Sequence, residues 1–140
     1  MQVHASCAAR DGAGVLLVGP SGSGKSDLLL RLLDRGYALV ADDRVEIVDG
    51  VASAPPALAG LLEVRGMGVF RLPHVASARI ALAVDLGGGR DRLPMPGRYP
   101  GFDIPFVALD GAAASAPQRV TLALDCALGL ACQLVGAFAA

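Results

Sequence analysis

Apolar runs alternate with short polar segments along the first third of the chain. An apolar run at 14–18 is followed by a glycine-rich stretch at 19–24, and leucines then recur at helical spacing over 25–35, where Gly36 ends the pattern. A second apolar run covers 37–41. This order predicts a strand, a loop, a helix and a strand, which together form a βαβ unit.

Six further strand-like runs follow, with little helical periodicity between them. They cover 46–48, 62–64, 69–72, 80–86, 106–109 and 120–124. A glycine run at 87–89 and a proline- and glycine-rich stretch at 94–105 mark a long irregular loop, and such loops in small domains are often functional. The sequence therefore predicts a strand-rich α/β sheet with few helices.

The composition is typical of one folded domain covering residues 1–140. Hydrophobic residues make up 54% of the chain and charged residues 18%, which argues against disorder. Lys and Arg number 12 against 13 Asp and Glu, and aromatic residues reach only 4%. Since neither a basic surface nor stacking platforms are indicated, nucleic-acid binding is not expected.

Three cysteines, Cys7, Cys126 and Cys132, occur without CxxC spacing, and no signal peptide precedes the first strand-like run. Reduced thiols in the cytoplasm are the natural interpretation. Residues 120–140 have about the length of a membrane span, but Asp125 lies within them. Inserting a central Asp costs about 2.5–3.5 kcal/mol, so we do not expect a membrane span.

The glycine-rich stretch matches the phosphate-binding pattern G-x-x-x-x-G-K-[ST] between a strand and a helix. It reads Gly19, Pro20, Ser21, Gly22, Ser23, Gly24, Lys25 and Ser26. Glycines allow backbone amides to converge on phosphate oxygens at a helix N-terminus. The lysine supplies charge for the β- and γ-phosphates, and the serine offers its hydroxyl to Mg²⁺. The pattern predicts binding of a nucleoside triphosphate or another polyphosphate, and an ordinary Gly/Ser turn is the less favoured alternative.

Four apolar runs end in aspartate, at Asp42, Asp85, Asp110 and Asp125. In a right-handed βαβ unit, the strand after the helix ends at the sheet edge that holds the phosphates, so Asp42 and Asp43 are expected there. The other three are interpreted as residues that begin turns, and a solvated turn is also an alternative for Asp42 and Asp43. Two adjacent carboxylates suggest that one lies near a metal and the other accepts a proton.

Four stretches carry a family resemblance, in order along the chain. They are residues 3–4, the phosphate loop 19–26, the A-D-D-x-V-E segment within 40–46, and the L-L-E-V-R-G-x-G segment within 61–69. Together they span about residues 1–90 and resemble the catalytic domain of the HPr kinase/phosphorylase family, serine kinases of a phosphocarrier protein. The resemblance implies a P-loop fold like the HPr kinase/PEP carboxykinase-like catalytic core.

The resemblance also implies roles for individual residues. Asp42 would take the proton from the acceptor serine and return it in the reverse reaction, with His4 and Lys25 in the catalytic set. Ser26 and Glu63 would hold Mg²⁺. The cofactors implied are ATP and Mg²⁺, and the partner implied is an HPr-like phosphocarrier protein.

Two further residues belong to the candidate catalytic set. Asp43 is the neighbour of the implied acid/base, and Arg92 resembles a catalytic arginine of the family. Other interpretations remain open: His4 would also suit a surface position near a frayed N-terminus. Glu63 and Arg65, two apart in a strand, would share a face and pair with each other.

The chain also departs from the family pattern. Longer members have an additional N-terminal domain and C-terminal helices that contact the carrier, so this chain resembles short single-domain forms, and assembly into a homo-oligomer stays open. The resemblance predicts Mg·ATP-dependent phosphorylation of a carrier serine and its reversal by inorganic phosphate with release of pyrophosphate. The alternatives are a small-molecule P-loop kinase, with 87–105 as a lid, and a non-catalytic nucleotide or phosphate sensor.

Overall fold

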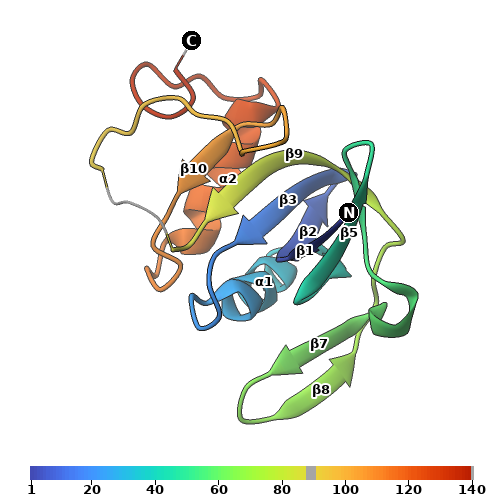
Figure 1. Ribbon diagram of the computed structural model, residues 1–140. Coiled ribbons are helices and arrows are strands. Elements are labelled where there is room, and N and C mark those ends of the chain that lie inside the picture. Colours follow the sequence, from blue (N-terminus) through green and yellow to red (C-terminus); the bar gives the residue numbers. More distant parts are fainter. Residues whose placement is uncertain (88–90, 140) are drawn as a thin grey trace.

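The computed structural model describes residues 1–87 and 91–139 of the chain. These residues form a mixed sheet of eight strands, a separate two-stranded hairpin, two α-helices and one 3-10 helix (Figure 1). The strands are β1 (Gln2–His4), β2 (Ser6–Arg10), β3 (Ala13–Val18), β4 (Ala38–Ala41), β5 (Arg44–Val48), β6 (Val51–Ser53), β7 (Leu61–Val64), β8 (Gly68–Arg71), β9 (Ala78–Asp85) and β10 (Phe106–Ala108); the helices are α1 (Lys25–Asp34), α2 (Ala116–Ala127) and η1 (Pro56–Leu58). A strand-rich α/β fold with few helices is confirmed.

The strand order of the large sheet explains where the site lies. The order is β1-β5-β6-β9-β3-β2-β4, with β10 beside β9. β3, β9 and β10 run parallel, and β2 lies between β3 and β4, antiparallel to both. β4 therefore points the same way as β3, as the βαβ pattern predicts, although the pattern does not predict a strand between them. The ends of β3 and β4 and the start of β2 meet at one sheet edge.

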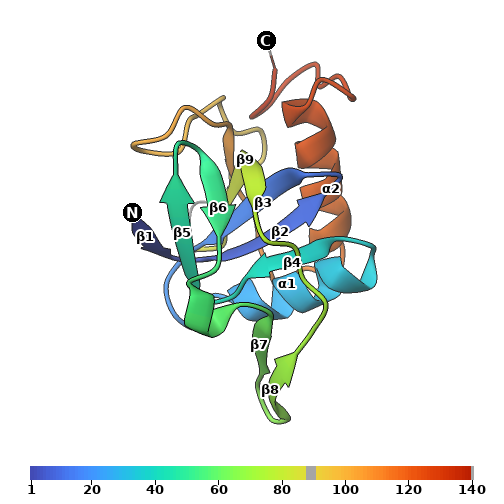
Figure 2. The same cartoon turned by 90° about the vertical axis from the view of Figure 1, so that its right-hand side faces the viewer.

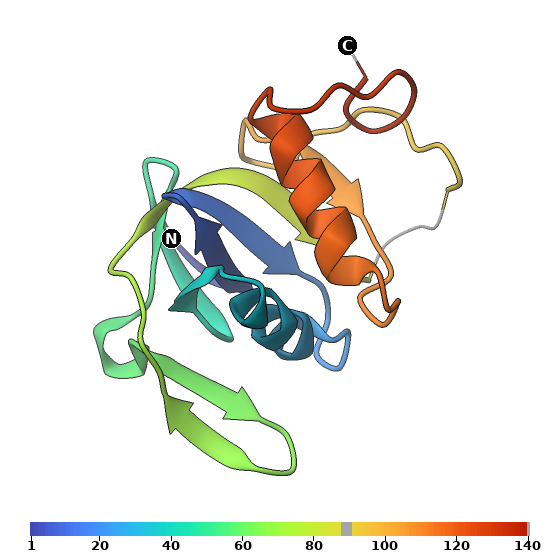
Figure 3. The same cartoon turned by 180° about the vertical axis from the view of Figure 1, so that it is seen from behind.

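Both helices pack on one face of this sheet (Figure 3). Their apolar stripes bury leucines and valines against β3 and β9, and the contacting side chains include Leu28, Leu29, Leu32, Val120, Leu124, Val15, Leu17, Leu82 and Val84. The opposite face packs against β5 and an aromatic segment at 99–106, as the turned view in Figure 2 helps to follow. A sheet covered on both sides explains the continuous apolar run of β9.

The β7–β8 hairpin projects from the body of the molecule (Figures 1 and 2). Its two strands pair only with each other among the described residues. Leu62 of β7 is fully buried in the core, whereas every residue of β8 is exposed. Because a lone two-stranded hairpin is marginally stable in water, burial of Leu62 helps to attach it to the fold.

Residues 120–124, predicted as a strand, lie in α2, so that prediction is wrong. The run Val-Thr-Leu-Ala-Leu is short and starts with two β-branched residues, and such runs cannot be assigned by periodicity alone. The wider segment resolves the ambiguity, because Ala116, Val120, Ala123 and Leu124 are buried at helical spacing. Asp125 consequently belongs to a helix and does not begin a turn.

The other aspartates that end apolar runs do begin turns. Asp85 Oδ1 accepts a hydrogen bond from the Gly87 amide at 2.8 Å, and Asp110 Oδ1 accepts one from the Ala112 amide at 3.0 Å. Residues 94–105 form an irregular segment, as predicted, whereas 88–89 of the glycine run lie outside the described residues. In the described part of the chain, no helix is long and apolar enough to cross a membrane.

Candidate functional site

The loop 19–24 connects β3 to α1 at the edge of the sheet, and its shape depends on glycine. Gly19, Gly22 and Gly24 have positive φ angles of 143°, 83° and 96°. A Cβ at Gly19 would lie 2.7 Å from Ser23 Oγ, so a larger residue does not fit there. The loop leads into the N-terminus of α1, whose free amides attract anions. This local geometry suits an anion such as phosphate.

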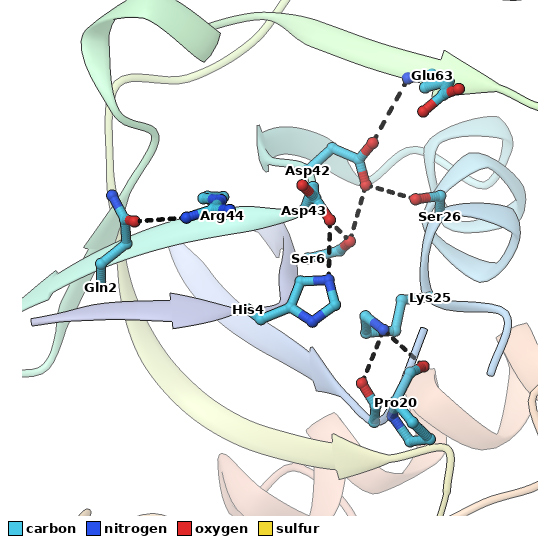
Figure 4. A network of polar contacts seen from close by, with 11 residues as sticks. Gln2, His4, Ser6, Pro20, Lys25, Ser26, Asp42, Asp43, Arg44 and Glu63 are labelled. Carbon is cyan, nitrogen blue, oxygen red and sulfur yellow. Dashed lines mark hydrogen bonds and ion pairs between the residues drawn. The ribbon is translucent and has the colours of Figure 1, made fainter. Parts of the chain in front are cut away.

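Lys25 is the only lysine of the chain, and its side chain folds back over this loop. Its Nζ donates hydrogen bonds to the carbonyl oxygens of Gly19 at 2.7 Å and Pro20 at 2.9 Å (Figure 4). The residue is only 7% exposed. Two carbonyl partners leave the ammonium a third proton for an anion held in the loop.

Asp42 follows β4 and lies beneath the site, with 8% of its surface exposed. Its Oδ1 accepts hydrogen bonds from Ser26 Oγ at 2.7 Å and from Ser6 Oγ at 2.8 Å. Its Oδ2 faces the Glu63 amide at a long 3.5 Å. The carboxylate thus connects the end of β4 with α1, β2 and β7 (Figure 4). The structure thus places Asp42 next to Ser26, at the end of the strand that follows α1.

Asp43 points to a different partner from Asp42. Its backbone is left-handed, with φ of 69°, and its Oδ1 lies 2.9 Å from His4 Nε2. The His4 and Asp43 side chains are 47% and 63% exposed, so their attraction contributes little to stability. The left-handed turn therefore separates two adjacent carboxylates, one buried and one open to solvent.

A cavity of about 420 Å³ lies against the phosphate loop and gathers most of the predicted site residues. His4, Lys25, Ser26, Asp43 and Glu63 line it, together with Ser21, Gly22 and Gly24 of the loop. Glu63, Val64 and Arg65 form its wall on the hairpin side. No ion pair joins Glu63 to Arg65 within the described residues, so the alternative that they simply pair with each other has no support.

Arg92 lies elsewhere. It lines a second cavity of about 500 Å³, together with Asp110 and residues of β10 and α2 such as Arg119. The lining of the phosphate-loop cavity does not include Arg92 in this structure. A catalytic role for Arg92 stays a prediction that would require the arginine to reach the first cavity.

The donors at the first cavity suit a hard divalent cation. Mg²⁺ usually takes one or two carboxylates, phosphate oxygens and several waters, so a cage made wholly by the protein is not required. Ser26 Oγ and the Glu63 carboxylate line the same cavity, and Asp42 lies directly behind Ser26. The described residues contain no cluster of three or more His, Cys, Asp or Glu side chains arranged to hold a metal.

Ser6, which contacts Asp42, has no recognisable signal in the sequence. It is one serine in a short stretch of small residues, outside any spacing pattern. Only the burial of side chains in the structure points to Ser6. Among the described residues, the buried polar or charged side chains are Ser6, Lys25 and Asp42. All three lie at this site.

Comparison with known proteins gives a consistent result. Residues 1–80 match the family model described as the HPr Serine kinase C-terminal domain. HPr kinase/phosphorylase of Lacticaseibacillus casei (strain BL23) is 44% identical over 72 residues, covering 48% of this chain and 23% of that protein. HPr kinase/phosphorylase of Cupriavidus necator is 40% identical over 104 residues, covering 63% of this chain and 32% of that protein. The matched region is thus about a quarter to a third of these curated relatives.

The fold has a counterpart among solved structures. The Hpr(Ser) kinase/phosphatase from Coxiella burnetii superimposes with a TM-score of 0.75 and 23% sequence identity, covering 93% of this chain and 92% of that chain. The likeness therefore covers more of the chain than the family model, which ends at residue 80.

Proposed function

Because the chain belongs to the HPr serine kinase C-terminal domain family, we propose that it transfers the γ-phosphoryl group of ATP to a serine of an HPr-like phosphocarrier protein. The observation that carries this proposal is the hydrogen bond between Ser26 of the phosphate loop and the buried Asp42. This bond supports the proposal because phosphoryl transfer needs a carboxylate close to the loop proposed to bind the polyphosphate.

The phosphate loop and Lys25 would bind the phosphates of ATP, while Ser26 and Glu63 would hold Mg²⁺, which neutralises charge on the β- and γ-phosphates when bound. Catalysis of this reaction depends mainly on positioning and electrostatic stabilisation. The glycine-rich loop would position the phosphates of ATP, and Lys25 would stabilise their negative charge. Glu63, Val64 and Arg65 of the hairpin line the same cavity, beside the proposed donor site.

Asp42 is proposed as the proton acceptor. As the serine oxygen of the carrier attacks the γ-phosphorus, its proton passes to Asp42, and ADP leaves with the bridging oxygen. Oδ2 of Asp42 has only the 3.5 Å contact to the Glu63 amide, so it has lone pairs available for that proton. Asp43 and His4 line the cavity and are proposed to orient the acceptor.

The reverse reaction is proposed to use the same site. An oxygen of inorganic phosphate attacks the phosphorus of the phosphoserine, the serine oxygen leaves and receives a proton from Asp42, and pyrophosphate forms. The phosphate would occupy the position of the β-phosphate in the loop. Since the same donors stabilise the transition state from either direction, one cradle serves both reactions.

We place this reaction in the cytoplasm, which agrees with the three free cysteines of the described chain. A direct test is to incubate the protein with an HPr-type carrier, ATP and Mg²⁺ and to measure the mass of the carrier. We expect one phosphoryl group on a serine, and its loss when inorganic phosphate is added in excess. An unmodified carrier in the presence of protein that binds ATP would contradict the proposal.

A further inference from the structure

Ser6 is a fully buried polar residue in a stretch of β2 that is otherwise small and apolar. Its neighbours Ala5 and Cys7 are also fully buried. A buried hydroxyl costs free energy unless it forms a hydrogen bond, and Ser6 Oγ donates to Asp42 Oδ1 at 2.8 Å. The hydroxyl is therefore directed at the carboxylate proposed as the proton acceptor.

Asp42 receives two hydroxyl groups on the same oxygen. Ser26 donates to Oδ1 from α1, and Ser6 donates to it from β2, on a different side of the carboxylate (Figure 4). Oδ2 has no partner closer than the Glu63 amide at 3.5 Å among the described residues. Two donors from separate elements fix the plane of the carboxylate and leave Oδ2 as the oxygen with free lone pairs.

The two donors differ in how firmly they are held. Ser26 belongs to the phosphate loop, and its hydroxyl is proposed to serve the cation and phosphates as well. Ser6 lies in a strand with neighbours on both sides and pairs with Leu17 of β3. The Ala5 amide also donates to the Asp43 carbonyl at 3.2 Å, which ties the start of β2 to the end of β4. Ser6 therefore keeps its position when Ser26 changes partner.

We propose that Ser6 is a positioning residue for phosphoryl transfer. It holds Oδ1 of Asp42 so that Oδ2 faces the acceptor hydroxyl, and it keeps this hold when the Ser26 hydroxyl is engaged by the bound substrate. This inference rests on the proposed role of Asp42, because Ser6 acts only through that carboxylate.

Ser6→Ala tests the proposal with the loss of a single oxygen atom. We expect kcat for carrier phosphorylation to fall about tenfold, because a misplaced catalytic group slows the step without weakening ground-state binding. The KM for the carrier and the affinity for ATP should change less than about twofold. Wild-type kcat in Ser6→Ala would overturn the inference.

Cys7→Ala is the matched control. Cys7 is the next residue of the same strand and equally buried, and its thiol makes only a weak contact with the Ala8 carbonyl at 3.8 Å. A general loss of packing in β2 would lower kcat in both variants. We expect Cys7→Ala to keep the kcat of the wild type, and an equal loss in the two variants would overturn the positioning role.

A crystal structure of Ser6→Ala gives an answer that does not depend on the carrier. We expect the Asp42 carboxylate to turn away from its wild-type plane, and an unchanged orientation would overturn the inference. If the wild-type protein phosphorylates no carrier, the proposed function fails. The orientation of Asp42 in the variant would still decide whether Ser6 positions it.

Discussion

The region before residue 86 and the region after residue 90 contribute differently to this molecule. The first holds the phosphate loop, Asp42 and the whole lining of the first cavity, and most of it matches the family model. The second supplies β10 and α2, closes the core over β9, and lines the second cavity. The proposed chemistry therefore lies in the first region, whereas the second stabilises the sheet that positions it.

The two regions also differ in where they expose large apolar side chains. After residue 90, Leu122, Leu130, Leu134 and Val135 are 62%, 71%, 87% and 63% exposed. Before residue 86, the large exposed apolar side chains include Met67 and Val69 of the hairpin. The polar residues around Asp42 are buried by comparison. Substitutions in the first region should therefore change ATP affinity or phosphoryl transfer, whereas substitutions in the second should change mainly the free energy of unfolding.

Lys25→Ala should give the largest effect, because it removes the single lysine from the phosphate loop. We expect ATP affinity to fall at least about a hundredfold, and phosphoryl transfer to become undetectable. Isothermal titration calorimetry and the carrier assay measure the two quantities. Arg35→Ala, an exposed residue at the end of the same helix, should leave both unchanged. Wild-type affinity in Lys25→Ala would show that the cradle is not the nucleotide site.

Leu124→Ala tests the structural role of the second region. Leu124 is fully buried, and truncating such a leucine typically costs about 2–5 kcal/mol of unfolding free energy. We expect a lower denaturation midpoint in urea, with ATP affinity unchanged while the protein is folded. Leu122→Ala on the same helix is the control, since Leu122 is 62% exposed. Equal losses in the two variants would contradict the assigned core face of α2.

Arg92→Ala tests whether the region after residue 90 also contributes a catalytic residue. If Arg92 reaches the acceptor, we expect kcat for transfer to fall about tenfold with ATP affinity retained. Arg98→Ala is a suitable comparison, because Arg98 is exposed and makes only a 3.7 Å contact with Asp103. Wild-type kinetics for Arg92→Ala would restrict the catalytic set to residues before residue 86.

Asp125→Asn tests the ion pair that joins the two regions. Arg10 of β2 donates to Asp125 of α2 at 2.6 Å, and this hydrogen bond raises the pKa of Arg10. Both side chains are about one quarter exposed, so we expect a loss of about 1 kcal/mol in unfolding free energy. Asp103→Asn, at a side chain that is 98% exposed, should cost nothing measurable in the same urea titration.

Cysteine reactivity tests the burial of β2 and does not involve the proposed catalytic residues. Burial raises the pKa of the Cys7 thiol from about 9 to about 12, whereas Cys132 is exposed. At pH 8, iodoacetamide should label Cys132 and leave Cys7 unmodified in the folded protein. Because the folded state binds the Cys7 proton more tightly than the unfolded state, stability should fall as pH rises above 9, by at most about 1.4 kcal/mol per pH unit. Rapid labelling of Cys7 would contradict its burial.

The phosphate loop and the position of Asp42 could be predicted from sequence, because each follows from a local pattern. The loop depends on glycines and on Lys25 and Ser26 in fixed register, and the handedness of βαβ units then places Asp42 at the same edge. The helix α1 could be predicted for the same reason, since its apolar spacing and the glycines at both ends are local signals.

Other features depend on contacts between distant segments. The strand β2 contains small residues with weak β preference, so neither the strand nor its Ser6 has a local signal. The divergence of Asp42 and Asp43 results from a left-handed turn at Asp43. Residues 120–124 taken alone are compatible with strand and helix alike, and the helix is recognised only from the wider segment, whose buried face packs against β9.

The central claim is that the site at this sheet edge transfers phosphoryl groups to a protein serine. It is tested most directly by measuring phosphoserine on the carrier and ADP in the same reaction. We expect one phosphoserine for each ADP, and no ADP beyond background when the carrier is omitted. ADP production that proceeds equally without the carrier, or without phosphoserine, would contradict it.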